Sequence, residues 1–111
     1  MTVTVKPLVA AKTAENSQTT QYTATGVTAI IDKFTATNYT STTAYLSVNI
    51  VTSGDTAGNQ NLITKTRYLQ SGETYTFPEL VGQVLAPGGF ISTIAGTASA
   101  INMRVSGREV T

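Results

Sequence analysis

The segment AYLSVNIV, residues 44–51, shows the most regular alternation of side chains in the sequence. Apolar residues occupy every second position, and the polar or amphipathic residues Tyr45, Ser47 and Asn49 lie between them. Because successive side chains of a β-strand point to opposite faces, a period of two predicts a strand with one face in the core. The chain must therefore build a sheet with a buried side.

Further segments carry the same signal. VTAIIDKFTATN (27–38) predicts a strand whose apolar phase slips at Asp32-Lys33, which indicates a β-bulge or a kink there. LITKTRYL (62–69), FISTIAG (90–96) and AINMRVSGREV (100–110) predict three more strands. Ser71-Gly72 predicts a hairpin turn that joins the strand 62–69 to the segment ETYTFPEL.

One segment departs from the β pattern. In ELVGQVLAPGG (79–89), Leu80, Val81, Val84 and Leu85 recur with the spacing of one face of a short helical turn, and Pro87 and the glycines after it end the pattern. About six strands with one helical insertion predict an all-β fold, an antiparallel β-sandwich or small jelly roll.

The 111 residues fit one domain. Residues 1–25 are Thr-rich and weakly patterned, and we interpret them as an arm outside the sandwich of residues 26–111. VTVKPLVAA in this arm suits a short edge strand, since Pro7 is tolerated at an edge. The arm either docks on a neighbouring subunit or is a mobile end, and docking predicts disorder of residues 1–21 in the isolated protein.

The charge pattern argues against two classes of partner. Seven Lys and Arg residues and six acidic residues give a net charge of +1, and the basic residues are scattered along the chain. Nucleic acids and anionic membranes both select clustered basic residues, so neither is an expected partner. Charged residues make up 12% of the chain, against about 25% in typical domains. Thr-rich strand faces of this kind suit an all-β domain with Thr on its solvent face, or a surface that a partner covers.

The residue types for most enzyme chemistry are missing. The chain has no Cys and no His, which removes thiolate chemistry, the commonest general base and the commonest metal ligand. We therefore expect no catalysis, no metal and no cofactor. A small hydrolase built on carboxylates is the enzyme alternative, with Glu73 and Glu79 as its best candidates.

Three residues are candidates for contact with another subunit. Tyr45 lies on the polar face of its predicted strand, and Tyr combines apolar area with a hydroxyl group. Arg108 and Glu109, in the segment SGRE near the C-terminus, are candidates for an intersubunit ion pair. The alternative for these two residues is a solvated strand end.

The segments AIIDKFTATNYTSTTAYLSVNIVTSG and TRYLQSGETYTFPELVGQVLAPGGFISTIAGTASAINMRVSGREV, in this order, resemble small virion structural proteins of tailed bacteriophages and prophages. The resemblance covers about the last three quarters of the chain and lies in strand and turn residues, with no catalytic signature. It implies a β-sandwich that binds the major capsid protein or other virion proteins, with self-association as a further expectation.

The resemblance implies a capsid decoration or cement protein that stabilises the head shell. The alternative within the virion is a neck, head-tail adaptor or tail-associated protein. Assembly would take place in the host cytoplasm, since MTVTVKPLVAAKTAENS lacks the apolar segment of a secretory leader. A carbohydrate- or receptor-binding sandwich is the more distant alternative, which the five tyrosines and the polar loop 53–61 favour and the lack of Trp disfavours.

Overall fold

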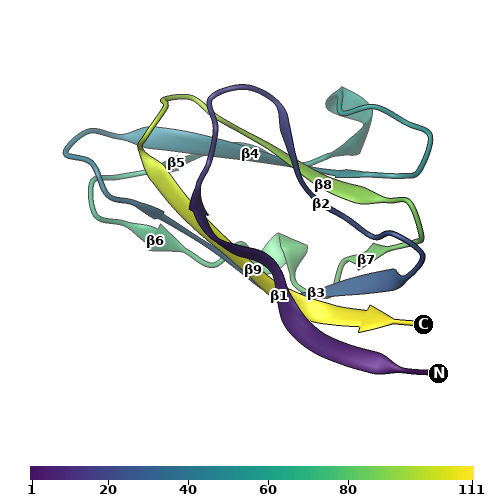
Figure 1. Cartoon of the computed structure of the whole chain (residues 1–111). Helices are drawn as coiled ribbons and strands as arrows, with labels where there is room; N and C mark the ends of the chain where they lie inside the picture. The colour runs from purple at the N-terminus through teal and green to yellow at the C-terminus, as the bar shows by residue number, and fades with distance from the viewer.

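The computed structural model describes all 111 residues and shows two antiparallel sheets packed face to face (Figure 1). Sheet A has the strand order β1 (Val3–Thr13), β9 (Ile101–Val110), β3 (Thr28–Asn38) and β6 (Thr74–Tyr75), and β7 (Val84–Leu85) also pairs with β3. Sheet B has the order β2 (Thr19–Thr23), β8 (Phe90–Ala95), β4 (Ala44–Val51) and β5 (Leu62–Leu69). The predicted β-sandwich is confirmed.

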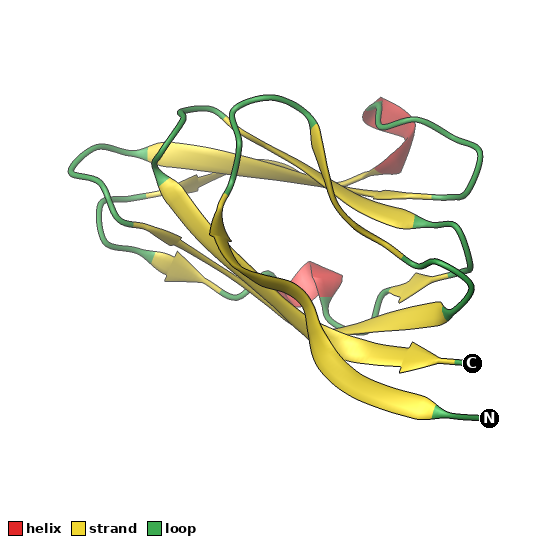
Figure 2. Cartoon of the chain, viewed as in Figure 1, coloured by secondary structure: helices red, strands yellow, loops and turns green.

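Strands make up most of the chain, and the only helices are the single 3-10 turns η1 (Asn59–Asn61) and η2 (Pro78–Leu80) (Figure 2). The core is a cluster of 21 buried residues between the sheets. Phe34 of sheet A is fully buried and packs against Phe77, with 4.9 Å between the ring centroids. Leu46 and Val48 of β4 are equally buried, as their alternation predicts.

The predicted division at residue 25 does not separate two parts of the fold. Residues 1–25 form β1, which pairs with β9 along sheet A, and β2, which pairs with β8 in sheet B. Leu8 and Val9 of this region belong to the core cluster. Thr is as good a strand former as the apolar β-branched residues, so the weak apolar pattern hid two edge strands. The edge position predicted from Pro7 is confirmed, since β1 is the outermost strand of sheet A.

The predicted bulge in β3 is confirmed. The register between β3 and β9 shifts between Ile31 and Lys33, opposite Gly107 and Ser106. β9 itself runs without a break. Gly107 is required there, because a Cβ atom would lie 2.2 Å from the carbonyl oxygen of Ile30.

The hairpin predicted at Ser71-Gly72 is wrong. The turn exists, and Gly72 has a positive φ of 77°. However, β5 lies in sheet B and β6 pairs with Ala36 and Thr37 of β3 in sheet A. The connection therefore crosses between the sheets. Turn residues specify a local reversal, but the partner of the next strand depends on distant residues.

The helical segment predicted after Glu79 is mostly wrong. The 3-10 turn η2 ends at Leu80, and β7 follows at Val84. Leu80 and Leu85 are buried, whereas Val81 and Val84 are exposed, so the four apolar residues do not share one face. Two residues of β7 suffice to pair with Ala29 and Ile30 and to place Val84 on the surface.

Candidate functional site

The structure holds no cluster of three or more His, Cys, Asp or Glu side chains that would bind a metal ion. None of its helical segments has the length and apolar character needed to cross a bilayer. The features that remain for function are two polar clusters at the open sides of the sandwich, one cavity, one polar pocket and one exposed apolar surface.

The first polar cluster closes the open side between β5 and β6. The Glu79 carboxylate accepts hydrogen bonds from the Thr64 hydroxyl at 2.5 Å and from the Tyr75 hydroxyl at 3.0 Å. The Arg67 guanidinium lies 3.9 Å from the centroid of the Tyr75 ring. Desolvation raises the pKa of Glu79, but the hydrogen bonds and Arg67 outweigh it and leave the pKa below its ordinary value.

The second polar cluster closes the opposite side, between β2 and the pair β1 and β9. The Glu109 carboxylate accepts a hydrogen bond from the Tyr22 hydroxyl at 2.5 Å, and Lys6 donates to it at 3.4 Å. The bond from Tyr22 holds the pKa of Glu109 below its ordinary value. Burial and the same carboxylate raise the pKa of Tyr22. Both clusters thus pair a neutral tyrosine with an ionised glutamate.

Glu73 and Glu79, the two candidate residues for a carboxylate hydrolase, both form hydrogen bonds within the chain. Glu79 has the partners given above, and Glu73 accepts from the backbone N–H of Gln70 at 2.8 Å in the turn that follows β5. Arg67 lies 3.9 Å from Glu73. These contacts connect neighbouring parts of the fold and account for both side chains.

The outer face of sheet A carries an exposed apolar surface near the chain ends. The strand register places Val5, Arg108, Ile30 and Val84 side by side on β1, β9, β3 and β7. Val5 is 78% exposed and Val84 is 56% exposed. We call the apolar members of this face the outer stripe, and they are Val3, Val5, Ile30, Val84 and Val110.

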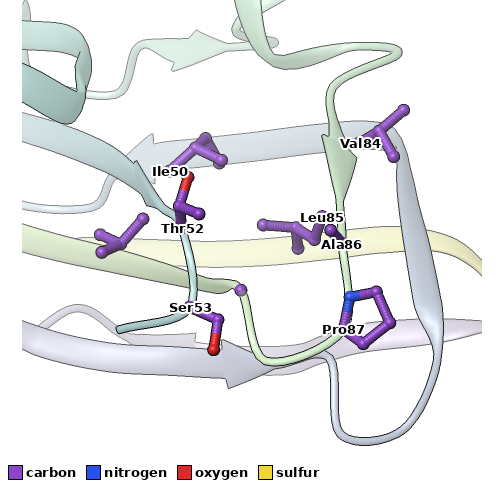
Figure 3. Close-up of a pocket in the computed structure, with 9 residues that line it drawn as sticks. Ile50, Thr52, Ser53, Val84, Leu85, Ala86 and Pro87 are labelled. Carbon is purple, nitrogen blue, oxygen red and sulfur yellow. The ribbon is translucent and has the colours of Figure 1, made fainter. Parts of the chain in front are cut away.

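A cavity of about 240 Å³ lies beside the outer stripe, between β7 and the end of β4. Figure 3 shows Leu85 pointing toward Ile50 and Thr52, whereas Val84 points away from them. Pro87 and Ser53 also line the cavity. It is a mainly apolar recess.

A polar pocket of about 180 Å³ lies on the outer face of sheet B. Its floor includes Asn49, which is only 2% exposed and donates to the backbone oxygen of Gly58 at 3.0 Å and to Asn61 at 2.7 Å. Gln18 donates to Asn49 and to Ser92. This network ties the loop after β4 onto the sheet.

The structure does not bring the three predicted contact residues together. Tyr45 lies on sheet B, lines the polar pocket, and packs edge-on against Tyr68 with 5.5 Å between centroids. Arg108 lies on the outer face of sheet A and donates to Asp32 at 2.8 Å. Glu109, the next residue, points inward to Tyr22. The intersubunit role of all three stays a prediction, and Arg108 and Glu109 already have partners within the chain.

Sequence reasoning missed the outer stripe. Val3 and Val5 fell in the presumed arm, and Val84 was placed on the same helical face as buried Leu80. A signal for the first two exists in TVTV, whose period of two is that of a strand, although it is too short to say which face is exposed.

No protein-family model, no curated protein and no solved structure matches this chain.

Proposed function

We propose that this chain is a structural protein of a tailed-phage virion and that it decorates the head by binding the major capsid protein. The resemblance of the sequence to small virion proteins supports this proposal. The single structural observation that carries a binding role is the outer stripe, where valines up to 78% exposed lie on the outer face of sheet A. An exposed apolar surface of this kind is typical of a protein contact.

The stripe also has the composition of an interface. Arg108 lies between Val5 and Ile30 of the stripe, and Asp32 holds it in place through three hydrogen bonds, the shortest of 2.8 Å. Arg is enriched at protein interfaces, and an Arg held by a neighbour loses little freedom on binding. The cavity beside Val84 offers a recess for an apolar side chain of the capsid subunit.

Cryo-electron microscopy and quantitative mass spectrometry of purified particles test the location. Density over the capsid lattice, with the chain in a fixed ratio to the capsid protein, is the expected result. Density confined to the portal vertex would instead assign the chain to the neck or tail. Absence of the chain from particles would refute a virion role.

The binding surface is tested by adding purified protein to particles that lack it. We expect Val84→Lys to reduce occupancy strongly, because a charge would be buried in the contact. Ile63→Lys is the matched control, since Ile63 is a 37% exposed residue of β5 in the other sheet. Equal occupancy of the two variants would exclude the outer stripe as the docking surface.

A second candidate function is carbohydrate binding at the polar pocket of sheet B. The observation that favours it is that Tyr45, Asn59, Lys65 and Gln18 line one recess. An aromatic ring with amides around it suits a sugar. A glycan array with the wild type and Tyr45→Ala tests this, and binding that Tyr45→Ala abolishes would support it. No bound glycan on the array would remove this candidate.

A further inference from the structure

The free edge of sheet A leaves backbone groups of β1 without a partner strand. β1 is the outermost strand, and Thr2 and Thr111 exchange both backbone hydrogen bonds, at 3.2 and 3.0 Å. In an antiparallel pair, such bonds recur at every second residue. The backbone N–H and C=O groups of Thr4 and Lys6 therefore point toward β9. Those of Val3 and Val5 point away from the sheet, toward the solvent at its edge.

Natural proteins usually blunt a free edge, and this chain does so only in part. Pro7 has no N–H, so the edge cannot accept a partner strand beyond it. Val3 and Val5 carry no such protection. Their side chains are 49% and 78% exposed. The pairing groups and the apolar side chains are thus available on the same two residues.

We propose that β1 pairs with β1 of a second copy of this chain, antiparallel, about a two-fold axis at Thr4. The segment Val3-Thr4-Val5 reads the same in both directions, so Val3 lies opposite Val5 of the partner in both halves. This register uses the N–H and C=O groups of Val3 and Val5 in both chains. It also places β-branched residues opposite each other, which stabilises a sheet.

Neighbouring registers are less favourable. Moving the axis to Val5 sets Val3 opposite Pro7, which has no N–H to donate. Moving it to Val3 sets Val5 opposite Met1, which lies outside β1. In the register centred at Thr4, Lys6 lies opposite Thr2 of the partner and meets no like charge.

The pairing joins the two outer stripes into one surface. Residues directly opposite each other in an antiparallel pair share a face, so Val3 and Val5 of both copies lie on the face that carries Ile30 and Val84 in each chain. The first five residues of β1 are all exposed, whereas Leu8 and Val9 are buried, so the pairing segment is the exposed end of β1. Figure 1 shows this end of β1 beside the end of β9 at the tip of the molecule.

Cross-linking through single cysteines tests the register, because the natural chain has no Cys. Opposite residues that do not exchange hydrogen bonds have Cα atoms about 4.5 Å apart, which suits a disulfide. We therefore expect Thr4→Cys to form a covalent dimer on mild oxidation. In this register Thr2 lies opposite Lys6 of the second copy, so the two Cys residues of Thr2→Cys would be four positions apart along the strand, about 14 Å. Thr2→Cys is therefore the matched control on the same strand face.

The expected result is that Thr4→Cys forms the covalent dimer at a rate that rises with protein concentration, whereas Thr2→Cys, whose Cα atoms lie beyond the reach of a disulfide, forms it only at the background rate of random collision. Equal rates for the two variants, or no dimer from Thr4→Cys, would overturn the proposal.

Sedimentation of the uncross-linked protein is the second measurement. We expect a concentration-dependent dimer that Val5→Pro weakens, since Val5→Pro removes an edge N–H that β9 does not use. A monomer at all concentrations would count against the pairing. Neither experiment involves particles, so their failure leaves the proposed virion function to its own test.

Discussion

The two open sides of the sandwich are closed by the same chemistry, a tyrosine hydroxyl on a glutamate, but in different settings. Between β5 and β6, Tyr75 also packs against Phe77, with 4.6 Å between ring centroids, and Phe77 packs against Phe34 in the core. Between β2 and β9, no aromatic pair involves Tyr22, and its carboxylate partner Glu109 has Lys6 as its other contact. Both tyrosines pack against the core cluster, but only Tyr75 belongs to a row of aromatic rings that reaches Phe34.

The aromatic row on the β5 and β6 side is tested most strongly at Phe77, which is fully buried. We expect Phe77→Ala to lower the free energy of unfolding by about 3–5 kcal/mol, from lost burial and a cavity. The change also removes the ring that holds Tyr75 in place. Urea denaturation followed by circular dichroism measures this loss, and a cost below that of Tyr22→Phe would show that the aromatic row does not support its side of the sandwich.

Removal of each tyrosine hydroxyl compares the two closures directly. A hydrogen bond to a charged group contributes about 1.5–3 kcal/mol. In Tyr75→Phe, Glu79 keeps the donor Thr64, so we expect the free energy of unfolding to fall by about 1.5 kcal/mol or less. In Tyr22→Phe, Glu109 keeps only Lys6 at 3.4 Å, so we expect the larger loss. Denaturation of the two variants side by side measures the difference, and the opposite order would contradict the role given to Thr64.

These closures also show how far the sequence alone reaches. The alternation in residues 44–51 and the phase slip at Asp32 gave a correct strand and a correct bulge, because both signals are local. The Tyr–Glu pairs join residues 87 and 4 positions apart. The first pair depends on β2 lying over β9, which no local pattern states. The second is close in sequence, but the wrong hairpin placed Tyr75 in the sheet of β5.

The same reasoning explains the outcome for the candidate surface. Whether an apolar strand residue is buried depends on what covers the face to which it points. Leu85 is buried and its neighbour Val84 is exposed, because successive residues of β7 point to opposite faces. Tyr45 was correctly placed on the polar face of β4, because alternation fixes that face. That Arg108 would meet Asp32 required the register of β9 on β3. Local chemistry was predictable, and the meeting of distant strands was not.

Acidification tests the two carboxylates together. The pKa values of Glu79 and Glu109 lie below their ordinary value of 4.5 in the folded protein. A carboxyl group with a lowered folded pKa adds stability above its unfolded pKa, and this stability is lost as the pH falls through the folded pKa. We therefore expect the free energy of unfolding to fall below about pH 4.5. This acid loss should be smaller in Glu79→Gln and in Glu109→Gln, and an unchanged pH profile in both variants would contradict the assignment.

The smallest expected effect concerns Lys6, the cation of the β2 and β9 closure. Its ammonium group lies 3.4 Å from Glu109, and its side chain is 43% exposed. Exposed ion pairs contribute about 0–1 kcal/mol, and salt screens them. We expect Lys6→Ala to cost a few tenths of a kcal/mol at low salt, by the same estimate, and nothing measurable at high salt. Tyr22→Phe should keep most of its larger cost in salt, because its hydroxyl bond is partly buried. If salt abolished both costs equally, the closure would be held by long-range charge, and the hydrogen bond from Tyr22 would not be its main support.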